Sequence, residues 1–118
     1  MRKFDLFVGF LGNGLTVCNR AVMVNGDFKR VAWISPAGNI HWYVRERCVP
    51  KKDLETVQHH AENCRREFVE NLEKRSEIDQ YSRILYAIPT EKFLEFSRDT
   101  RSISEKLPEM REYYYTIS

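Results

Sequence analysis

The sequence contains few cysteines, few glycines and prolines, and no long hydrophobic run. Its 118 residues include three Cys, five Gly and four Pro. The cysteines are odd in number and form no CxxC motif, so neither a disulfide-rich scaffold nor a cysteine zinc motif is indicated. No stretch approaches the roughly 20 apolar residues of a membrane span, and Asp5 interrupts the N-terminal segment where an export signal would need its apolar run. We therefore expect a reduced, cytoplasmic protein with no membrane partner.

The composition is that of one ordinary globular domain, which we expect to cover residues 1–118. Its charge is unevenly divided. Residues 1–52 carry nine Lys/Arg against three Asp/Glu, a net +6, whereas residues 53–118 carry a net −4. A basic half joined to an acidic half indicates an anionic partner or head-to-tail self-association. The alternative is that the acidic helices are simply solvated and the basic excess has no function.

Three glycines lie close together in the stretch GFLGNGLTVC at residues 9–18. Their spacing matches neither GxGxxG nor GxxxxGK[ST], and the following LTVCNRAVMV is rich in strand formers rather than helical. A phosphate-binding loop is therefore not indicated. Asn-Gly is the favoured pair of a type I′ hairpin turn, so Asn13-Gly14 is predicted to join two strands.

Two further turn signals extend this hairpin into a sheet. Asn25-Gly26 predicts a second tight turn, and Pro36-Ala37-Gly38 a three-residue loop. The resulting register pairs Phe10 with Val17, Val17 with Ile34, and Ile34 with Ile40, which keeps one apolar set on one face. We predict an α+β fold with a four-stranded antiparallel β-meander at about residues 3–46, within a segment 1–47.

The opposite face of this predicted sheet mixes aromatic rings with cations. The expected register places Cys18, Val22 and Val31 there among larger side chains. The candidate partner surface consists of Phe7, Arg20, Lys29, Trp33, His41, Tyr43 and Arg45.

Three interpretations of that face remain open. Trp, Tyr and Arg are enriched at protein-binding hot spots, which favours a protein partner or a homo-oligomer. Aromatic rings beside cations also suit single-stranded nucleic acid, because bases stack on the rings and cations hold the backbone. The third possibility is that the C-terminal helices cover the face and make it a second core layer.

The segment 50–118 has helical periodicity. A long stripe from Leu54 to Leu72 predicts an amphipathic helix that packs on the apolar sheet face. Two or three further helices follow, although residues 83–88 also suit a strand. In the last helix, Pro108 is expected in the opening turn, because an interior proline removes a hydrogen bond. Tyr115 falls off the apolar stripe and is expected to be exposed.

Chemical constellations are sparse. His60 and Cys64 share a helical face but lack a second ligand pair, so a structural role is favoured over a metal site. Cys18 and His41 share the outer sheet face, which leaves a Cys/His enzyme as a remote alternative. We expect a non-enzymatic protein with no catalytic, cofactor-binding or metal residues.

The stretch FDLFVGFLGNGLTVCNRAV…NGDFKRVAWIS…GNIHWYV resembles small uncharacterised bacterial proteins carried on mobile genetic elements such as conjugative elements and phages. The resemblance covers about the first 45 residues and does not extend into the helical half. It implies an accessory role in element maintenance, transfer or host conflict. No catalytic residues come with it.

Overall fold

A computed structural model describes residues 4–118 and confirms the α+β fold. Its internal contacts divide the chain into two compact units, Met1–Phe68 and Val69–Ser118, which we call the sheet unit and the helical unit. The boundary lies inside the long helix α1, Lys51–Glu73. The chain therefore divides within α1, and not near residue 50 where the strands end and the helices begin.

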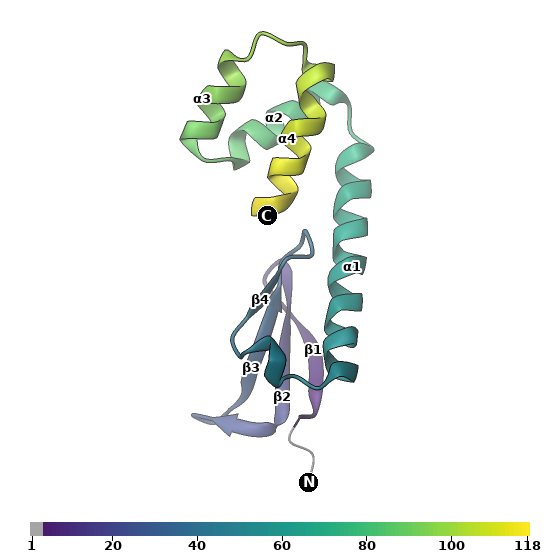
Figure 1. The fold of residues 1–118 in the computed structure, drawn as a ribbon, viewed down its shortest axis with the longest axis vertical. Coiled ribbons are helices and arrows are strands. Elements are labelled where there is room, and N and C mark those ends of the chain that lie inside the picture. Colours follow the sequence, from purple (N-terminus) through teal and green to yellow (C-terminus); the bar gives the residue numbers. More distant parts are fainter. Residues whose placement is uncertain (1–3) are drawn as a thin grey trace. The chain divides into compact units, whose positions relative to one another are not determined.

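The sheet unit is a four-stranded antiparallel meander in the order β1-β2-β3-β4, as predicted (Figure 1). The expected start at residue 3 lies outside the described residues. The strands are β1 Leu6–Leu11, β2 Gly14–Val24, β3 Asp27–Ile34 and β4 Ile40–Trp42, and the 3-10 helix η1 Glu46–Cys48 leads into α1.

Two of the three predicted turns are confirmed. Asn25 and Gly26 have φ of 51° and 85°, the left-handed pair that a type I′ turn requires, and Gly38 closes the three-residue loop with φ 82°. The first turn was predicted one residue too late. Gly12 and Asn13 form it, with φ 61° at Gly12, so Phe10 pairs with Leu15 rather than Val17.

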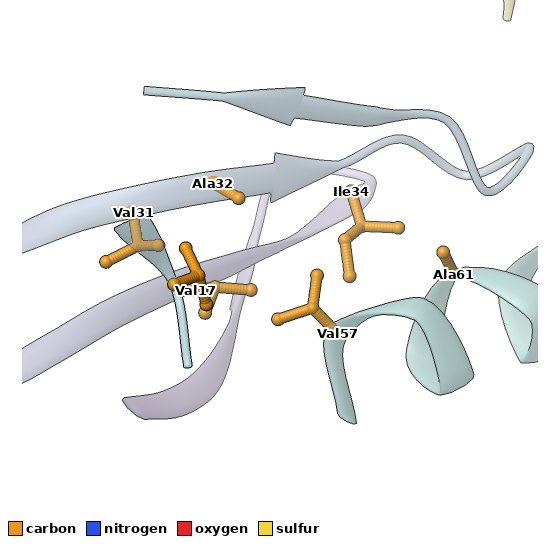
Figure 2. Close-up of a cluster of buried hydrophobic side chains, with 7 residues drawn as sticks. Val17, Val31, Ala32, Ile34, Val57 and Ala61 are labelled. Carbon is orange, nitrogen blue, oxygen red and sulfur yellow. The ribbon is translucent and has the colours of Figure 1, made fainter. Parts of the chain in front are cut away.

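The register between β2 and β3 also differs from the prediction, because the ladder is interrupted twice. Val17 pairs with Ala32, whereas the next residue, Cys18, pairs with Arg30, which leaves Val31 as the extra residue of a bulge. Val31 and Ala32 therefore both join the buried core (Figure 2). The prediction that Val31 faces outward was wrong.

The second interruption, between Asn19 and Met23, leaves backbone groups that a buried side chain satisfies. Asn19 is 2% exposed, and its Oδ1 accepts hydrogen bonds from Asp5 N at 2.9 Å and Ala21 N at 3.0 Å. An unpaired buried amide N–H would be costly, so the asparagine stabilises the irregular strand.

Helix α1 covers one face of the sheet, as predicted. Val57 and Ala61 pack with Val17 and Ile34 in one buried aliphatic cluster (Figure 2). The β3–β4 loop also lies close to α1. A side chain at Gly38 would meet the Ala61 carbonyl oxygen at 2.3 Å, so only glycine permits this approach.

The helical unit contains three further helices, α2 Glu77–Ala87, α3 Thr90–Arg98 and α4 Ile103–Ile117. Ser76 and Ser102 cap α2 and α4, since each hydroxyl accepts from the backbone N–H three residues later. Residues 83–88 are thus helical up to Ala87 and do not form a fifth strand.

Two expectations for α4 were wrong. The Ser102 cap starts the helix early, so Pro108 lies inside it rather than in its opening turn. The carbonyl of Ser104 consequently lacks its usual helical N–H donor, and because Ser104 is exposed, water can replace that donor. Tyr115 is only 8% exposed, and this burial, with a smaller contribution from Glu73, raises the pKa of its hydroxyl.

Candidate interaction surface

We call the side of the sheet opposite α1 the outer face. Leu6 and Val8 pack against the core, so the alternation along β1 directs Phe7 to the outer face. Phe7 pairs with Cys18, and Cys18 pairs with Arg30, which places all three on this side. Among the described residues, the outer face includes Phe7, Gly14, Thr16, Cys18, Arg20, Phe28, Arg30, Trp33, His41 and Tyr43.

One aromatic cluster lies across β1, β2 and β3. The rings of Phe7 and Phe28 meet edge to face, with centroids 5.4 Å apart. The Arg20 guanidinium lies over the Phe7 ring at 4.9 Å and forms a loose ion pair with Asp5 at 3.9 Å. A cation held over a ring while half exposed remains available to a partner.

A second aromatic cluster lies across β3 and β4. Trp33 and His41 are directly opposite each other, as predicted, and their rings stack at 5.3 Å with 29° between the planes. The indole also leans over β2. A Cβ on Gly14 would meet Trp33 Nε1 at 2.6 Å and the Ile34 carbonyl oxygen at 2.4 Å. Gly14 is therefore required by this close approach of the ring and backbone, and not by a turn.

Tyr43 follows β4 and remains largely in solvent, with 56% of it exposed. Its backbone N–H donates to the Val31 carbonyl at 2.8 Å, which holds the segment beside β3 after the strand ends. Trp42 and Val44 on either side both pack against the core. Alternation therefore directs the Tyr43 side chain to the outer face, as predicted.

The structure does not place Lys29 and Arg45 on the outer face. After the Val31 bulge, Lys29 pairs with the buried Asn19 and so lies on the α1 side of the sheet. Arg45 follows the end of β4 and is the residue before η1. Both line a hollow of about 230 Å³ together with Val22, which was also expected on the outer face.

Two outer-face residues were missed by the sequence reasoning. Regular alternation along β3 predicts Phe28 and Arg30 on the apolar side with Ala32, whereas the observed register places them on the outer face. The bulge reverses the alternation of β3 for the residues before Ala32. Phe28 and Arg30 therefore lie on the outer face, and Lys29 and Val31 lie on the α1 side. One signal in the sequence was the cationic Arg30 in a mostly apolar set.

The outer face separates the two residues of the remote enzyme alternative. Cys18 lies on β2 and His41 on β4, so β3 runs between them. Two strand spacings amount to roughly 10 Å, which exceeds the hydrogen-bond reach of a nucleophile and its base. The closest polar side-chain neighbour described for the Cys18 sulfur is Thr16 Oγ1, at 3.9 Å.

The other predicted pair of cysteine and histidine is His60 and Cys64, both on α1. Cys64 packs against the core, and this burial, with the nearby Glu67 carboxylate, raises the pKa of its thiol. Among residues 4–118, no group of three or more His, Cys, Asp or Glu side chains is arranged to hold a metal ion.

In the part of the chain that the structure describes, no helix combines the length and apolarity needed to cross a bilayer. No family model matches the sequence, and no curated protein or solved structure is significantly similar to it. The surface must therefore be interpreted from its own chemistry.

Proposed function

We propose that the chain is a non-enzymatic accessory protein that binds a protein partner through the outer face. The observation that carries the proposal is the presence of two aromatic clusters on one face, Trp33–His41 and Phe7–Phe28 with Arg20. Aromatic rings lose little conformational entropy on binding, and rings and arginines are enriched among the residues that dominate the energetics of protein interfaces. The sequence resemblance supports a role in a mobile genetic element.

An affinity-capture comparison tests this function. Tagged wild-type protein is incubated with extract of a bacterium that carries the gene, beside Trp33→Ala and Tyr43→Ala variants. Tyr86→Ala is the matched control, because this tyrosine is 90% exposed and lies on α2 of the helical unit. The partner should be retained by wild type and Tyr86→Ala and lost from the outer-face variants.

Because Trp33 also packs against Gly14, its replacement perturbs the sheet as well as the surface. Tyr43→Ala removes only an exposed ring and decides the outcome if Trp33→Ala unfolds. Equal recovery of the same proteins by wild type and by every folded outer-face variant, which is Tyr43→Ala alone if Trp33→Ala unfolds, contradicts the proposal.

Single-stranded nucleic acid is the second candidate partner, and the two outer-face arginines favour it. Arg30 lies on the same face as the Phe7–Phe28 cluster and Arg20 lies over it, so cations adjoin rings on which bases stack. Fluorescence anisotropy with a labelled oligothymidine then shows micromolar binding that weakens steeply with salt. Arg30→Ala reduces this binding, whereas Arg98→Ala in the helical unit does not. Absence of binding at low salt excludes this candidate.

A further inference from the structure

Among the described residues, no strand pairs with the outer edge of β1. Strand β1 is the first strand in the order β1-β2-β3-β4 and pairs with β2 through six consecutive residues without a bulge. Its sequence, LFVGFL, contains no charge and no proline. Natural edge strands are commonly shortened, bulged or charged, because their free N–H and C=O groups otherwise template pairing with another chain. The opposite edge, β4, has only three residues.

The hydrogen-bond pattern identifies which groups of β1 face the open edge. The Arg20 N–H donates to the Asp5 carbonyl at 2.9 Å, so this opposite pair is hydrogen-bonded. In an antiparallel ladder such pairs alternate, so Phe7 and Gly9 bond to β2. Leu6, Val8 and Phe10 direct their N–H and C=O groups outward from the sheet.

Phe10 has an environment unlike that of its neighbours on the same side of β1. It pairs with Leu15, which packs against the core together with Leu6 and Val8, so Phe10 also lies on the α1 side. Yet 90% of Phe10 is exposed. A phenylalanine at a bare edge, on the face that is otherwise core, leaves a large apolar area in water.

We propose that β1 pairs antiparallel with β1 of a second copy of this chain, about a two-fold axis through Val8. In this register Val8 faces the partner's Val8, and Leu6 faces the partner's Phe10. All six outward N–H and C=O pairs of the two strands are then satisfied, and each Phe10 ring lies beside an apolar side chain of the other copy. The two four-stranded sheets become one continuous eight-stranded sheet.

The outer side of the strand is equally self-complementary. The same two-fold axis places Phe7 opposite the partner's Gly9, which has no side chain to crowd it. The Phe7 ring therefore keeps its contacts with Phe28 and Arg20 in the dimer. A single register therefore matches hydrogen bonds, the core side and the outer side at once.

Charge does not oppose pairing with a second copy. Leu6–Leu11 carries no charge, so pairing it with itself brings no like charges opposite each other. The two Asp5 carboxylates lie at opposite ends, about six residues or roughly 20 Å apart, beyond the Debye length at physiological salt. Each is also beside its own Arg20.

The area sets the expected strength. An aromatic side chain buries about 150–250 Å², so the two Phe10 rings supply on the order of 300–500 Å². The strand edges add to this area, so the interface belongs at or below the lower end of specific interfaces, about 1,200 Å². We therefore expect a reversible dimer with a micromolar dissociation constant.

Sedimentation of the full chain across a micromolar concentration series tests the proposal. Wild type should pass from monomer to dimer, and Phe10→Lys should raise the dissociation constant about tenfold or more by placing a charge at the edge. Val8→Pro removes an outward N–H and should act likewise. Tyr86→Lys is the surface control and should dimerise as wild type does. Circular dichroism confirms that each variant is folded.

Amide hydrogen exchange tests the register independently of any substitution. With rising concentration, the Leu6, Val8 and Phe10 amides should gain protection, whereas those of Phe7 and Gly9 should change little. A monomer at every concentration, or a dimer unaffected by Phe10→Lys, overturns the proposal. Tyr43→Ala should still dimerise, so failure of this inference is distinguishable from failure of outer-face binding.

Discussion

The two units of the chain differ in whether they bury a charged side chain. In the sheet unit, Val17, Ile34 and Val57 are all at most 1% exposed and belong to a cluster of buried aliphatic side chains. In the helical unit, Lys106 is only 5% exposed and lies directly before the buried Leu107. A lysine is almost never this buried unless its ammonium group is fully engaged.

The buried ammonium caps a helix. Lys106 Nζ donates to the carbonyls of Phe96 at 3.0 Å and Asp99 at 3.2 Å, at the C-terminal end of α3. It also lies 4.9 Å from the centre of the Tyr81 ring. The last carbonyls of a helix lack helical partners and carry its negative dipole end, so a cation is favoured there.

The stability of the two units is therefore sensitive to different kinds of substitution. The aliphatic core of the sheet unit depends on volume, because burial of apolar surface has no direction. The helical unit depends in addition on buried donors and acceptors, since Gln80 is also buried and bonds both Arg75 O and the Arg111 guanidinium. Loss of one partner in such a network leaves a buried polar group unsatisfied.

The largest expected effect comes from reducing the volume of the sheet core. Ile34 is fully buried, so Ile34→Ala should lower the free energy of unfolding by about 2–5 kcal/mol. The measurement is urea denaturation. Ile78→Ala is the matched control, because that isoleucine is 69% exposed and its loss should cost less than about 0.5 kcal/mol.

Hydrogen exchange on the same variant tests whether the two units are independent. If they open separately, Ile34→Ala should reduce protection in β2 and β3 and leave α2 and α4 unchanged. Equal loss of protection in all four elements would show that the chain unfolds as one cooperative domain. A cost of Ile34→Ala no greater than that of Ile78→Ala would contradict the volume argument.

The corresponding change in the helical unit removes a donor and keeps the volume. Lys106→Met retains the apolar stem but leaves the Phe96 and Asp99 carbonyls without the ammonium, which should cost about 1–3 kcal/mol. Lys74→Met, at an exposed lysine, is the control for loss of charge. Unchanged or increased stability of Lys106→Met would mean that apolar packing replaces the buried cation.

The turn signals were sufficient to predict the order of the strands and the β3–β4 register. Pro36-Ala37-Gly38 allows only one short loop, and Ile34 pairs with Ile40 as expected. The first hairpin was less determined, because Gly12-Asn13 and Asn13-Gly14 both suit a two-residue turn. A change of this kind shifts the partners by two residues and keeps each side chain on its face, so the face assignments along β1 and along β2 as far as Arg20 survived.

The bulge was not predictable from alternation. Val31 and Ala32 are both apolar, and only the packed core shows that both are inward. Because both side chains point inward, the alternation along β3 shifts by one residue, so Arg30 rather than Lys29 lies on the candidate surface. Two of the seven predicted surface residues do not lie on the outer face: Lys29, because of the bulge, and Arg45, because β4 ends at Trp42. The other five are on the predicted face: Phe7, Arg20, Trp33, His41 and Tyr43.

Substitution of two glycines of the first hairpin distinguishes the cost of steric crowding from the cost of backbone strain in the sheet unit. Gly14→Ala should cost roughly 1–3 kcal/mol, because the new Cβ collides with the Ile34 carbonyl and the Trp33 ring. Gly12→Ala meets no atom within 4 Å but must adopt φ 61°, which should cost about 1 kcal/mol.

Tryptophan fluorescence distinguishes the two substitutions. Gly14→Ala must displace the indole of Trp33 from its stack on His41, so its emission should shift. Gly12→Ala should leave the emission unchanged. Identical spectra and identical costs for both variants would contradict the role assigned to Gly14.

The smallest expected effect is a pH dependence on the surface of the helical unit. Arg101 donates hydrogen bonds to the Asp99 carboxylate from its guanidinium and its backbone N–H, and these lower the pKa of Asp99 to about 2. The unfolded value is about 3.9. The folded state therefore prefers the ionised form, and this contribution is fully present above pH 4 or so and is lost as pH falls toward 2.

Urea denaturation of wild type and Asp99→Asn from neutral pH down to about 2 measures this contribution. Wild type should be slightly more stable at neutral pH, and the difference should disappear on acidification as Asp99 is protonated. Because the pair is exposed, added salt should also reduce the difference. Asp27→Asn, in the second hairpin, controls for loss of a carboxylate. A difference that is the same at both ends of the pH range would show that Asp99 acts through the shape of its side chain, since only an ionised carboxylate attracts the Arg101 guanidinium.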